Sequence, residues 1–358
     1  MAYYITLPRY TELSPDQQFA VDQTEPLALS GGPGTGKSVV CIWRHLRNYE
    51  TNSKKSLLLT YTKTLEHYLE SSAGDKNLEA KGRIDRVYLW SSGNSEKNAL
   101  QEYDEIIIDE AQDIPADVFR KILNYAKTLS YGADKRQSLY LRDDKLQELY
   151  TEFMSNPKIS NNFQVTLTKN YRNSREVLHF IRSAFPEVVI PRNVLDDAKA
   201  TGRKPIVHRM LAKDARSATE RVQMQIEDIA KIVKYYHDRT HNIAILLPYV
   251  NQIDKYYYGL KAVLTDDIEV TDDIEVSRYY NSLIGIEGMG DVHITTYKSS
   301  KGTEFDTVII PEFDYVCTTN TPRSDYYVAF TRAKLNLFLL CNGDFPPYFD
   351  VNTVLIEG

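Results

Sequence analysis

The sequence predicts an α/β protein of two tandem lobes, each a mainly parallel sheet with helices on both faces. Short apolar runs such as LALS, SLLLTYT and DEIIIDE alternate with helical periodicity in the first half. The alternation restarts in the second half with NIAILLP, DTVIIPE and LNLFLLC. Between the halves lies a polar, turn-rich stretch, SNPKISNN, which is the best candidate for a connection. We therefore expect a first lobe over 1–157 and a second over 158–358.

The expected elements of the first lobe follow one another along the chain. Strand-like runs alternate with amphipathic stretches, the pattern of units in which a helix connects two parallel strands. The strand-like runs are 27–30, 56–62, 104–110 and 128–134, and the helical stretches are 39–50, 63–72 and 116–126.

The second lobe repeats this pattern around a long amphipathic stretch over 218–238. The pattern of this lobe begins with VTLTKNYRNS over 165–174, and the strand-like runs that follow are 204–210, 242–248, 292–297, 306–312 and 335–341. One segment stands apart, because TDDIEVTDDIEV over 265–276 is a perfect hexapeptide duplication. Its alternation of Ile and Val with acids predicts an exposed hairpin or extended loop, and the spacing of the acids is unsuited to a calcium loop. We interpret it as a local duplication without chemistry.

Composition narrows the class of protein. The chain has 358 residues, of which 42% are hydrophobic and 26% charged, enough for two or three domains with their own cores. Its apolar runs stay well below the ~18 residues that a membrane span needs, and its cysteines have no metal-binding spacing. We expect a soluble, cytoplasmic protein without a membrane partner. The net charge of −6 does not decide whether nucleic acid binds, since a local basic channel can coexist with an acidic remainder.

The stretch GGPGTGKS fits the phosphate-binding loop G-x-x-x-x-G-K-[ST], placed between a strand-like and a helical segment as the motif requires. Backbone amides of such a loop surround phosphate oxygens at the start of a helix. The lysine reaches the β and γ phosphates of ATP, and the serine hydroxyl holds Mg²⁺. The predicted ATP-binding residues of this loop are Gly32, Gly34, Thr35, Gly36, Lys37 and Ser38.

A second motif, YDEIIIDEAQDI, places two carboxylates at the end of an apolar strand. In phosphoryl transfer, an acid at a strand tip completes the Mg²⁺ shell, and a neighbouring acid orients and deprotonates the attacking water. Asp109 is the predicted Mg²⁺ ligand together with Ser38, and Glu110 is the predicted base. This pair favours ATP hydrolysis over phosphate transfer to another substrate.

The two motifs resemble motifs I and II of superfamily 1 helicases of the UvrD, Rep and PcrA type, whose lobes are RecA-like. Further stretches resemble the motifs of this family in the expected order, from about residue 13 to residue 340. In the first lobe these are LSPDQ, LLLTYTKTL and GADKRQSLY. The resemblance implies that Gln17 reads the adenine, that Tyr61 and Thr62 meet single-stranded nucleic acid, and that Gln137 senses the γ phosphate.

In the second lobe, NYRNS, TYKSSKGTEFD and YVAFTRAK resemble motifs IV, V and VI. The resemblance implies stacking of Tyr171 on adenine and contact of Glu304 with the ribose. Arg172 and Arg332 would act as arginine fingers on the γ phosphate. Residues implied to contact the nucleic-acid backbone are Thr296, Lys298 and Ser299.

The leading hypothesis is an ATP-dependent 3′-to-5′ single-stranded DNA translocase or helicase, with ATP and Mg²⁺ as cofactors. The polarity and the UvrD-like type come from the resemblance alone. Because both fingers lie in the lobe without the phosphate loop, closure of the lobes on ATP would couple hydrolysis to movement. RNA is left open as the track, and a monomer is the expectation from the family.

Two alternatives remain open. One is a nucleic-acid-stimulated regulatory ATPase that controls a partner such as a nuclease, in DNA repair or defence, without processive unwinding. The other is a degenerate module that binds nucleotide or protein without turnover, which the intact motif residues disfavour.

Several departures from the family pattern bear on these alternatives. There is little room for the domains that larger relatives insert, so the chain resembles a near-minimal two-lobe core. Lys298 stands where many relatives have His, and the third motif is shifted around Tyr140 and Arg142. In DRVYLWSSG, Trp90 is interpreted as a core aromatic rather than a base contact.

Overall fold

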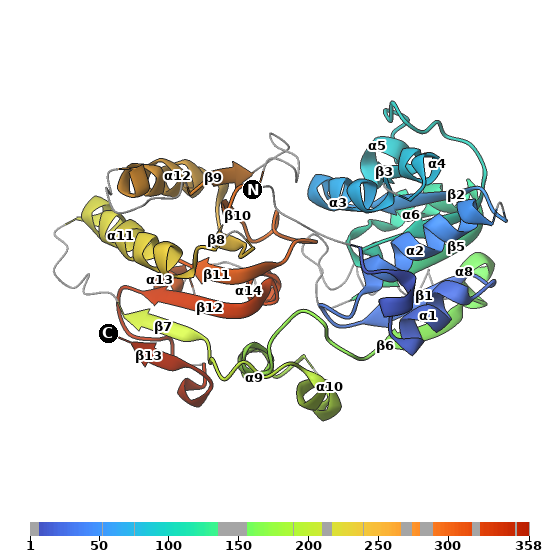
Figure 1. The fold of residues 1–358 in the computed structure, drawn as a ribbon. Helices are drawn as coiled ribbons and strands as arrows, with labels where there is room; N and C mark the ends of the chain where they lie inside the picture. The colour runs from blue at the N-terminus through green and yellow to red at the C-terminus, as the bar shows by residue number, and fades with distance from the viewer. Residues whose placement is uncertain are drawn as a thin grey trace. The chain divides into compact units, whose positions relative to one another are not determined.

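The computed structural model describes residues 7–51, 53–74, 76–134, 156–188, 190–209, 217–238, 240–265, 274–279, 289–316, 323–347 and 349–357. The chain divides into two compact units, one ending at Tyr171 and the other beginning at Arg172. Each unit is built on its own sheet (Figure 1).

The first unit contains a sheet whose described strands follow the order β3-β2-β4-β5-β1-β6. Among the described residues every pairing in this sheet is parallel. The strands are β1 (Leu27–Gly31), β2 (Ser56–Thr60), β3 (Ile84–Arg86), β4 (Tyr103–Ile108), β5 (Ala126–Ala133) and β6 (Phe163–Leu167). Because the strands are parallel, their carboxyl ends meet at one edge, where ligands bind in open α/β sheets.

Helices cover both faces of this sheet. One face carries α2, while α5, α6 and α8 lie over the other. The helical segments are η1 (Tyr10–Glu12), α1 (Pro15–Asp22), α2 (Lys37–Glu50), α3 (Lys63–Gly74), α4 (Leu78–Gly82), α5 (Val87–Ser91), η2 (Ala111–Asp113), α6 (Ala116–Leu123) and α8 (Pro157–Ser160).

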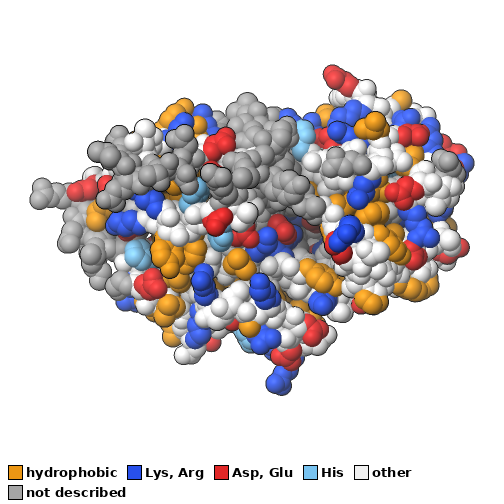
Figure 2. All heavy atoms as spheres, viewed as in Figure 1, with side chains coloured by type: hydrophobic (Ala, Val, Ile, Leu, Met, Phe, Trp, Pro, Cys, Tyr) orange, Lys and Arg blue, Asp and Glu red, His pale blue; other side chains and the backbone are white. Residues whose placement is uncertain are grey.

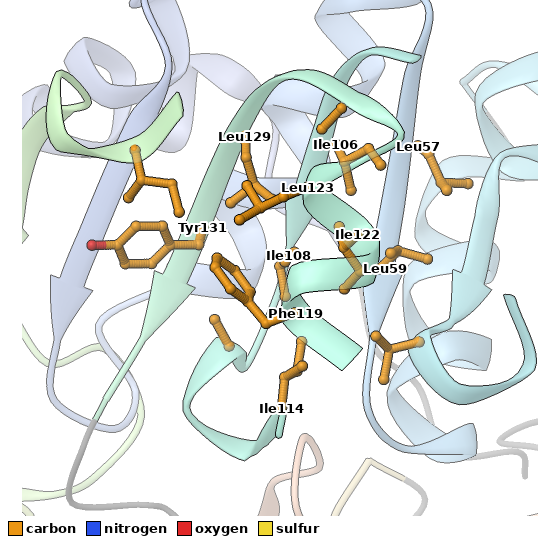
Figure 3. Close-up of a cluster of buried hydrophobic side chains, with 14 of the residues drawn as sticks. Leu57, Leu59, Ile106, Ile108, Ile114, Phe119, Ile122, Leu123, Leu129 and Tyr131 are labelled. Carbon is orange, nitrogen blue, oxygen red and sulfur yellow. The ribbon is translucent and has the colours of Figure 1, made fainter. Parts of the chain in front are cut away.

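The core between the sheet and α6 follows from the two-residue period of the strands. Leu57 and Leu59 of β2 point to the same side as Ile106 and Ile108 of β4, and α6 adds Phe119 (Figure 3). The alternate residues of β2 and β4 are also buried, which is expected of strands covered on both faces. This packing fixes the position of the acidic segment that follows β4.

The second unit contains a sheet with the described strand order β13-β7-β12-β11-β8-β10-β9 (Figure 1). Its pairings are again all parallel among the described residues. The strands are β7 (Ile206–Arg209), β8 (Ile243–Leu247), β9 (Val276–Tyr279), β10 (Val292–Thr296), β11 (Phe305–Ile310), β12 (Ala333–Cys341) and β13 (Leu355–Glu357).

One face of the second sheet is covered by α11 and α12, which share a core with β8 and β10. An aromatic cluster joins α9, α13 and α14, with Phe330 and Phe180 ring centroids 5.1 Å apart and Phe313 and Phe330 centroids 5.9 Å apart. The helical segments are α9 (Arg175–Ala184), α10 (Arg192–Asp197), α11 (Ala218–Tyr236), α12 (Val250–Thr265), α13 (Phe313–Val316), α14 (Arg323–Phe330) and η6 (Val351–Thr353).

The structure confirms the predicted fold class of two α/β lobes with parallel sheets and helices on both faces. The predicted division between 157 and 158 falls before β6, whereas β6 pairs with β1 along its whole length and belongs to the first sheet. The first unit therefore extends to Tyr171. Within the duplicated hexapeptide, residues 266–273 lie outside the described residues, and its interpretation remains a prediction. None of the described helices combines the length and the apolar character that crossing a membrane requires.

Truncating Phe119 to alanine should destabilise the first unit by about 3–5 kcal/mol, because this fully buried ring lies at the centre of the core in Figure 3. Both tryptophans of the chain, Trp43 and Trp90, belong to this unit, so tryptophan fluorescence during urea unfolding reports on it. The control is Leu78→Ala, whose side chain is 79% exposed and should change the free energy of unfolding by less than about 0.5 kcal/mol. Equal effects of both substitutions would contradict this view of the core.

Candidate nucleotide and nucleic-acid sites

The phosphate loop connects β1 to α2 at the carboxyl edge of the first sheet. Gly34 and Gly36 have φ angles of 69° and 87°, in the left-handed region that favours glycine. Gly36 is also the residue that caps the start of α2. The Nζ atom of Lys37 donates to the carbonyl oxygens of Gly31, at 2.9 Å, and Gly32, at 3.0 Å. The ammonium group therefore lies inside the loop, where it can meet phosphate oxygens.

The outer side of the loop is held by Gln17. The Nε2 atom of Gln17 donates to the carbonyl oxygen of Thr35 at 3.0 Å, and its Oε1 atom accepts from the backbone N–H of Ser14. Gln17 is only 5% exposed. The resemblance implied that this residue reads adenine, and the structure shows that its side chain supports the phosphate loop.

The segment of Asn170 and Tyr171 holds the loop from another direction. Asn170 donates from Nδ2 to the carbonyl oxygen of Pro33 at 2.8 Å. The backbone N–H of Tyr171 donates to the carbonyl oxygen of Gly34 at 2.9 Å. The ring of Tyr171 is 48% exposed, with the ammonium of Lys169 5.3 Å from its centroid. A half-exposed aromatic ring therefore lies beside the phosphate loop, and its adenine-stacking role remains a prediction.

Asp109 follows β4 at the same edge, and its side chain is fully buried. Neither carboxylate oxygen has a hydrogen-bond partner of good geometry among the described residues. Burial raises the pKa of Asp109 to about 7, with a further contribution from the neighbouring Glu110, while Ser38 and Lys37 oppose the shift. Burying a carboxylate that has no hydrogen bond of good geometry is costly, and a cation bound beside it would offset that cost.

These residues fit the Mg²⁺ ion that the motifs imply. A hydroxyl and a carboxylate are hard oxygen ligands of the kind that Mg²⁺ prefers, and Ser38 lies close enough to Asp109 to lower its pKa. Gly132 of β5 leaves room beside them. A Cβ atom there would lie 3.5 Å from Oδ1 of Asp109 and 3.6 Å from Cβ of Lys37.

Glu110 adopts an unusual backbone conformation for a residue other than glycine, with φ 59° and ψ 44°. Such strain occurs most often at functional sites. Gln112 donates from Nε2 to Glu110 and accepts at Oε1 from the backbone N–H of Asp134, at 3.1 Å. Gln112 therefore connects the predicted base to the segment after β5. The sequence analysis assigned no role to Gln112, although the DEAQD motif contains it. The predicted γ-phosphate sensor Gln137 lies outside the described residues.

In the second unit, the structure brings Arg172 and Glu304 together in an ion pair of 2.9 Å between Nε and Oε2. Burial would raise the pKa of Glu304, but the guanidinium of Arg172, helped by the charges of Lys334 and Arg332, holds this pKa below its ordinary value. The carboxylate is therefore ionised. Arg172 and Glu304, which are both predicted nucleotide contacts, thus form one polar site next to the start of β11.

Arg332, the other predicted finger, is only 2% exposed. Its guanidinium donates to the carbonyl oxygens of Val328, at 3.0 Å, and Thr303, at 3.1 Å. A third bond goes to the hydroxyl of Thr331. In this structure Arg332 thus stabilises the turn between α14 and β12.

The three predicted backbone contacts of the second unit lie at the carboxyl end of β10, with Thr296 as its last residue and Lys298 and Ser299 just beyond it. The Thr296 hydroxyl bonds to the Ser299 hydroxyl at 3.0 Å and accepts from the Ser299 backbone N–H at 3.1 Å. Lys298 is 45% exposed at its side chain and lies 4.0 Å from Asp325. These residues form one turn, with an exposed cation beside two hydroxyls.

In the first unit, Tyr61 and Thr62 follow β2 at the carboxyl edge. The Thr62 hydroxyl accepts from the backbone N–H of Leu65 at 3.2 Å and so caps α3.

Trp90 is fully buried in the core, which confirms its interpretation as a core aromatic. On the face drawn in Figure 2, basic and acidic side chains of the described residues are interspersed.

Comparison with known proteins bears on the first unit. Residues 17–142 match a family model described as an AAA domain, a stretch that contains the phosphate loop and the DEAQD motif. This match covers less than half of the chain. No curated protein matches the sequence.

Three solved structures are similar to the chain. The arterivirus helicase, nonstructural protein 10, has 12% sequence identity and a TM-score of 0.42, covering 92% of this chain and 62% of its own. The helicase of PRRSV has 13% identity and a TM-score of 0.42, covering 91% and 54%. The C-terminal domain of a possible DNA helicase from Lactobacillus plantarum WCFS1 has 16% identity and a TM-score of 0.35, covering 52% and 98%. The chain thus spans less than two thirds of either viral helicase, and at these scores the likenesses decide neither fold nor function.

Replacing Gly36 by alanine should destabilise the first unit by about 2–3 kcal/mol. The cost arises because alanine disfavours the left-handed backbone conformation and because the hydrogen bond from Gln17 to Thr35 is lost. A Cβ atom on Gly36 would lie 2.3 Å from Nε2 of Gln17. Urea unfolding without nucleotide measures the change. The matched control is Gly32→Ala, because a Cβ atom on Gly32 meets nothing within 4 Å. A cost for Gly32→Ala as large as that for Gly36→Ala would contradict the assigned constraint.

The titration of Asp109 should appear in the stability of the protein. Since its pKa is raised from 3.8 to about 7, the folded state keeps a proton that the unfolded state loses, and stability falls as pH rises through this window. Asp109→Asn removes the titration. In EDTA, the free energy of unfolding of the variant relative to wild type should therefore rise between about pH 4 and 7, by about 1 kcal/mol or more. The exposed control Asp117→Asn should show no such trend, and parallel curves for Asp109→Asn and wild type would refute the shift.

Proposed function

We propose that this protein is an ATP-dependent motor that hydrolyses ATP and moves on single-stranded DNA, in the 3′-to-5′ direction. The observation that carries the ATPase part is the site around Asp109, where a buried carboxylate without a hydrogen bond of good geometry among the described residues lies beside Lys37 and Ser38. A structural acid would be paired, whereas an acid that receives a metal and its nucleotide is expected to be open.

In this proposal each residue of the first unit has a distinct task. Lys37 leaves the carbonyl oxygens of Gly31 and Gly32 and contacts the β and γ phosphates. Ser38 and Asp109 hold Mg²⁺, which neutralises charge on the phosphates when bound. Glu110 orients the attacking water and accepts its proton, while Gln112 holds the carboxylate in place. Tyr171 covers the adenine.

The second unit supplies the arginine that makes hydrolysis depend on both units. We assign this role first to Arg172, whose Nε atom is bonded to Glu304 in an ion pair that is 15% exposed on the arginine side and 38% on the glutamate side. The guanidinium exchanges Glu304 for the γ phosphate, and Glu304 is then released toward the ribose. Arg332 would have to give up bonds to two carbonyl oxygens to act in the same way.

The track is proposed from the resemblance of the motifs together with polar groups at the carboxyl ends of β2 and β10, among which the side chain of Lys298 is exposed. Thr62 in the first unit and the turn of Thr296, Lys298 and Ser299 in the second offer hydroxyl groups and a cation to phosphates. DNA as the track and the 3′-to-5′ direction rest on the resemblance.

Glu110→Gln should lower the rate of ATP hydrolysis by about 10²–10⁴-fold while leaving ATP binding intact, because glutamine keeps the shape and the acceptor for Gln112 but cannot take a proton. Lys37→Ala should weaken ATP binding as well. Steady-state ATPase assays with and without single-stranded DNA, RNA and duplex measure both effects.

The matched control for these two variants is Tyr235→Ala, since this ring is 78% exposed on α11. Wild-type hydrolysis stimulated by single-stranded DNA, with displacement of streptavidin from the 5′ end of a strand, is the expected outcome. Full activity of Glu110→Gln would overturn the site assignment, and an unstimulated wild-type rate would overturn the motor.

A further inference from the structure

We propose that Tyr88 forms a base-stacking platform at the carboxyl edge of the first sheet, and that Tyr61 supports it from the side. This inference rests on the proposed function, because it names a contact of the same single-stranded track. It also changes the expectation for Tyr61, which the resemblance placed with Thr62 in contact with the strand.

The topology brings these two tyrosines together. Tyr61 directly follows β2, and Tyr88 is the second residue of α5, which directly follows β3. Strands β2 and β3 are parallel neighbours, with Thr60 paired to Arg86. The two rings therefore meet at one edge, with centroids 5.3 Å apart and planes inclined by 78°. This edge-to-face arrangement is a favourable geometry for an aromatic pair.

Burial along α5 shows which ring is available to a ligand. Val87, Trp90 and Ser91 are buried at helical spacing, and Trp90 donates from Nε1 to the carbonyl oxygen of Ala99. Tyr88 lies on the opposite side of this short helix and is 41% exposed. Tyr61, by contrast, is partly buried and packs against the core. The segment thus contributes one aromatic to the core and presents another to solvent.

An ionic cluster joins the two segments that carry the rings. Glu66 of α3, whose side chain is only 5% exposed, pairs with Arg86 at 3.1 Å and with Lys97 at 2.8 Å. Lys97 also pairs with Glu70, one turn further along α3. Since α3 begins just after Tyr61 and Arg86 lies just before α5, this cluster clamps the two segments that carry the rings. A platform fixed before binding loses little conformational freedom when a ligand arrives.

The ligand that fits this platform is the face of a nucleobase. Every base has an aromatic face, so such stacking is tolerant of sequence and contributes about 1–3 kcal/mol per base. Tyr88 has no charge, and its contribution should therefore be independent of salt, unlike contacts to phosphates. This difference separates the proposed role from a general effect on the electrostatics of the edge.

The test measures the affinity of the full chain for a fluorescent single-stranded oligonucleotide by anisotropy at several salt concentrations. Tyr88→Ala should weaken binding by about 5- to 150-fold, the equivalent of 1–3 kcal/mol, with an unchanged slope of affinity against salt. Tyr88→Phe keeps the aromatic face and should bind like wild type. Tyr235→Ala is the control for removal of an exposed tyrosine elsewhere.

Two further arms make the outcome specific. A strand with 2-aminopurine should lose fluorescence on binding to wild type and lose less with Tyr88→Ala, and an abasic strand should reduce the difference between these two proteins. Lys298→Ala should lower the salt slope by about 1, which shows that the assay detects phosphate contacts. Melting curves establish that each variant is folded.

Each outcome decides the inference. Weaker binding of Tyr88→Ala with retained binding of Tyr88→Phe supports it. Unchanged binding of Tyr88→Ala to a strand that wild type does bind overturns it and leaves the proposed function standing. Equal losses in Tyr88→Ala and Tyr88→Phe overturn stacking, because the hydroxyl would then be the contact. If wild type neither binds the strand nor hydrolyses ATP faster with it, the proposed function itself fails.

Discussion

A buried ion pair joins the helix that begins with Lys37 to the strand that ends before Asp109. Nε of Arg44 in α2 lies 2.7 Å from Oε1 of Glu105 in β4, and the two side chains are 2% and 0% exposed. Arg44 also donates to two backbone carbonyl oxygens, and Asn48 donates to the second carboxylate oxygen of Glu105. Removing one member of such a pair leaves an uncompensated buried charge, which typically costs about 3–5 kcal/mol. The phosphate loop and the acids therefore depend on this pair for their relative placement.

Two carboxylates of this segment show how the same fold produces opposite electrostatics. Burial would raise the pKa of Glu105, but the charges of Arg44 and Lys54 together with the hydrogen bonds from Ser130 and Asn48 outweigh it, and the pKa lies below its ordinary value. At Asp109, burial and the neighbouring Glu110 outweigh the opposing effects of Ser38 and Lys37, and the pKa is raised to about 7. Glu105 is surrounded by donors and stabilises the fold. Asp109 has no partner of good geometry among the described residues, and this difference distinguishes a structural acid from one that can receive a cation.

The charged residues of the second unit differ from these in their exposure and in their partners. Arg172 and Glu304 form a pair that is partly exposed, so that either group can exchange its partner at modest cost. Arg332 is bonded to the backbone around it and stabilises a turn. The sequence motifs imply the same role for Arg172 and Arg332. The structure distinguishes them, because their hydrogen-bond partners and their exposure differ. Exchange of partners at Arg172 is compatible with a contact that forms and breaks in every cycle of hydrolysis.

The sequence by itself determined the parts that depend on local pattern. The phosphate loop, the acids after β4 and the two parallel sheets follow from glycine spacing and from apolar runs, because backbone conformation and burial period are encoded within a few residues. Tertiary structure alone decided the parts that depend on pairing between distant segments. It placed β6 in the first sheet, directed Gln17 to the carbonyl oxygen of Thr35, and left the ring of Tyr88 exposed beside Tyr61. Each of these outcomes depends on which surfaces meet after the chain has folded, and no short stretch of sequence contains both partners.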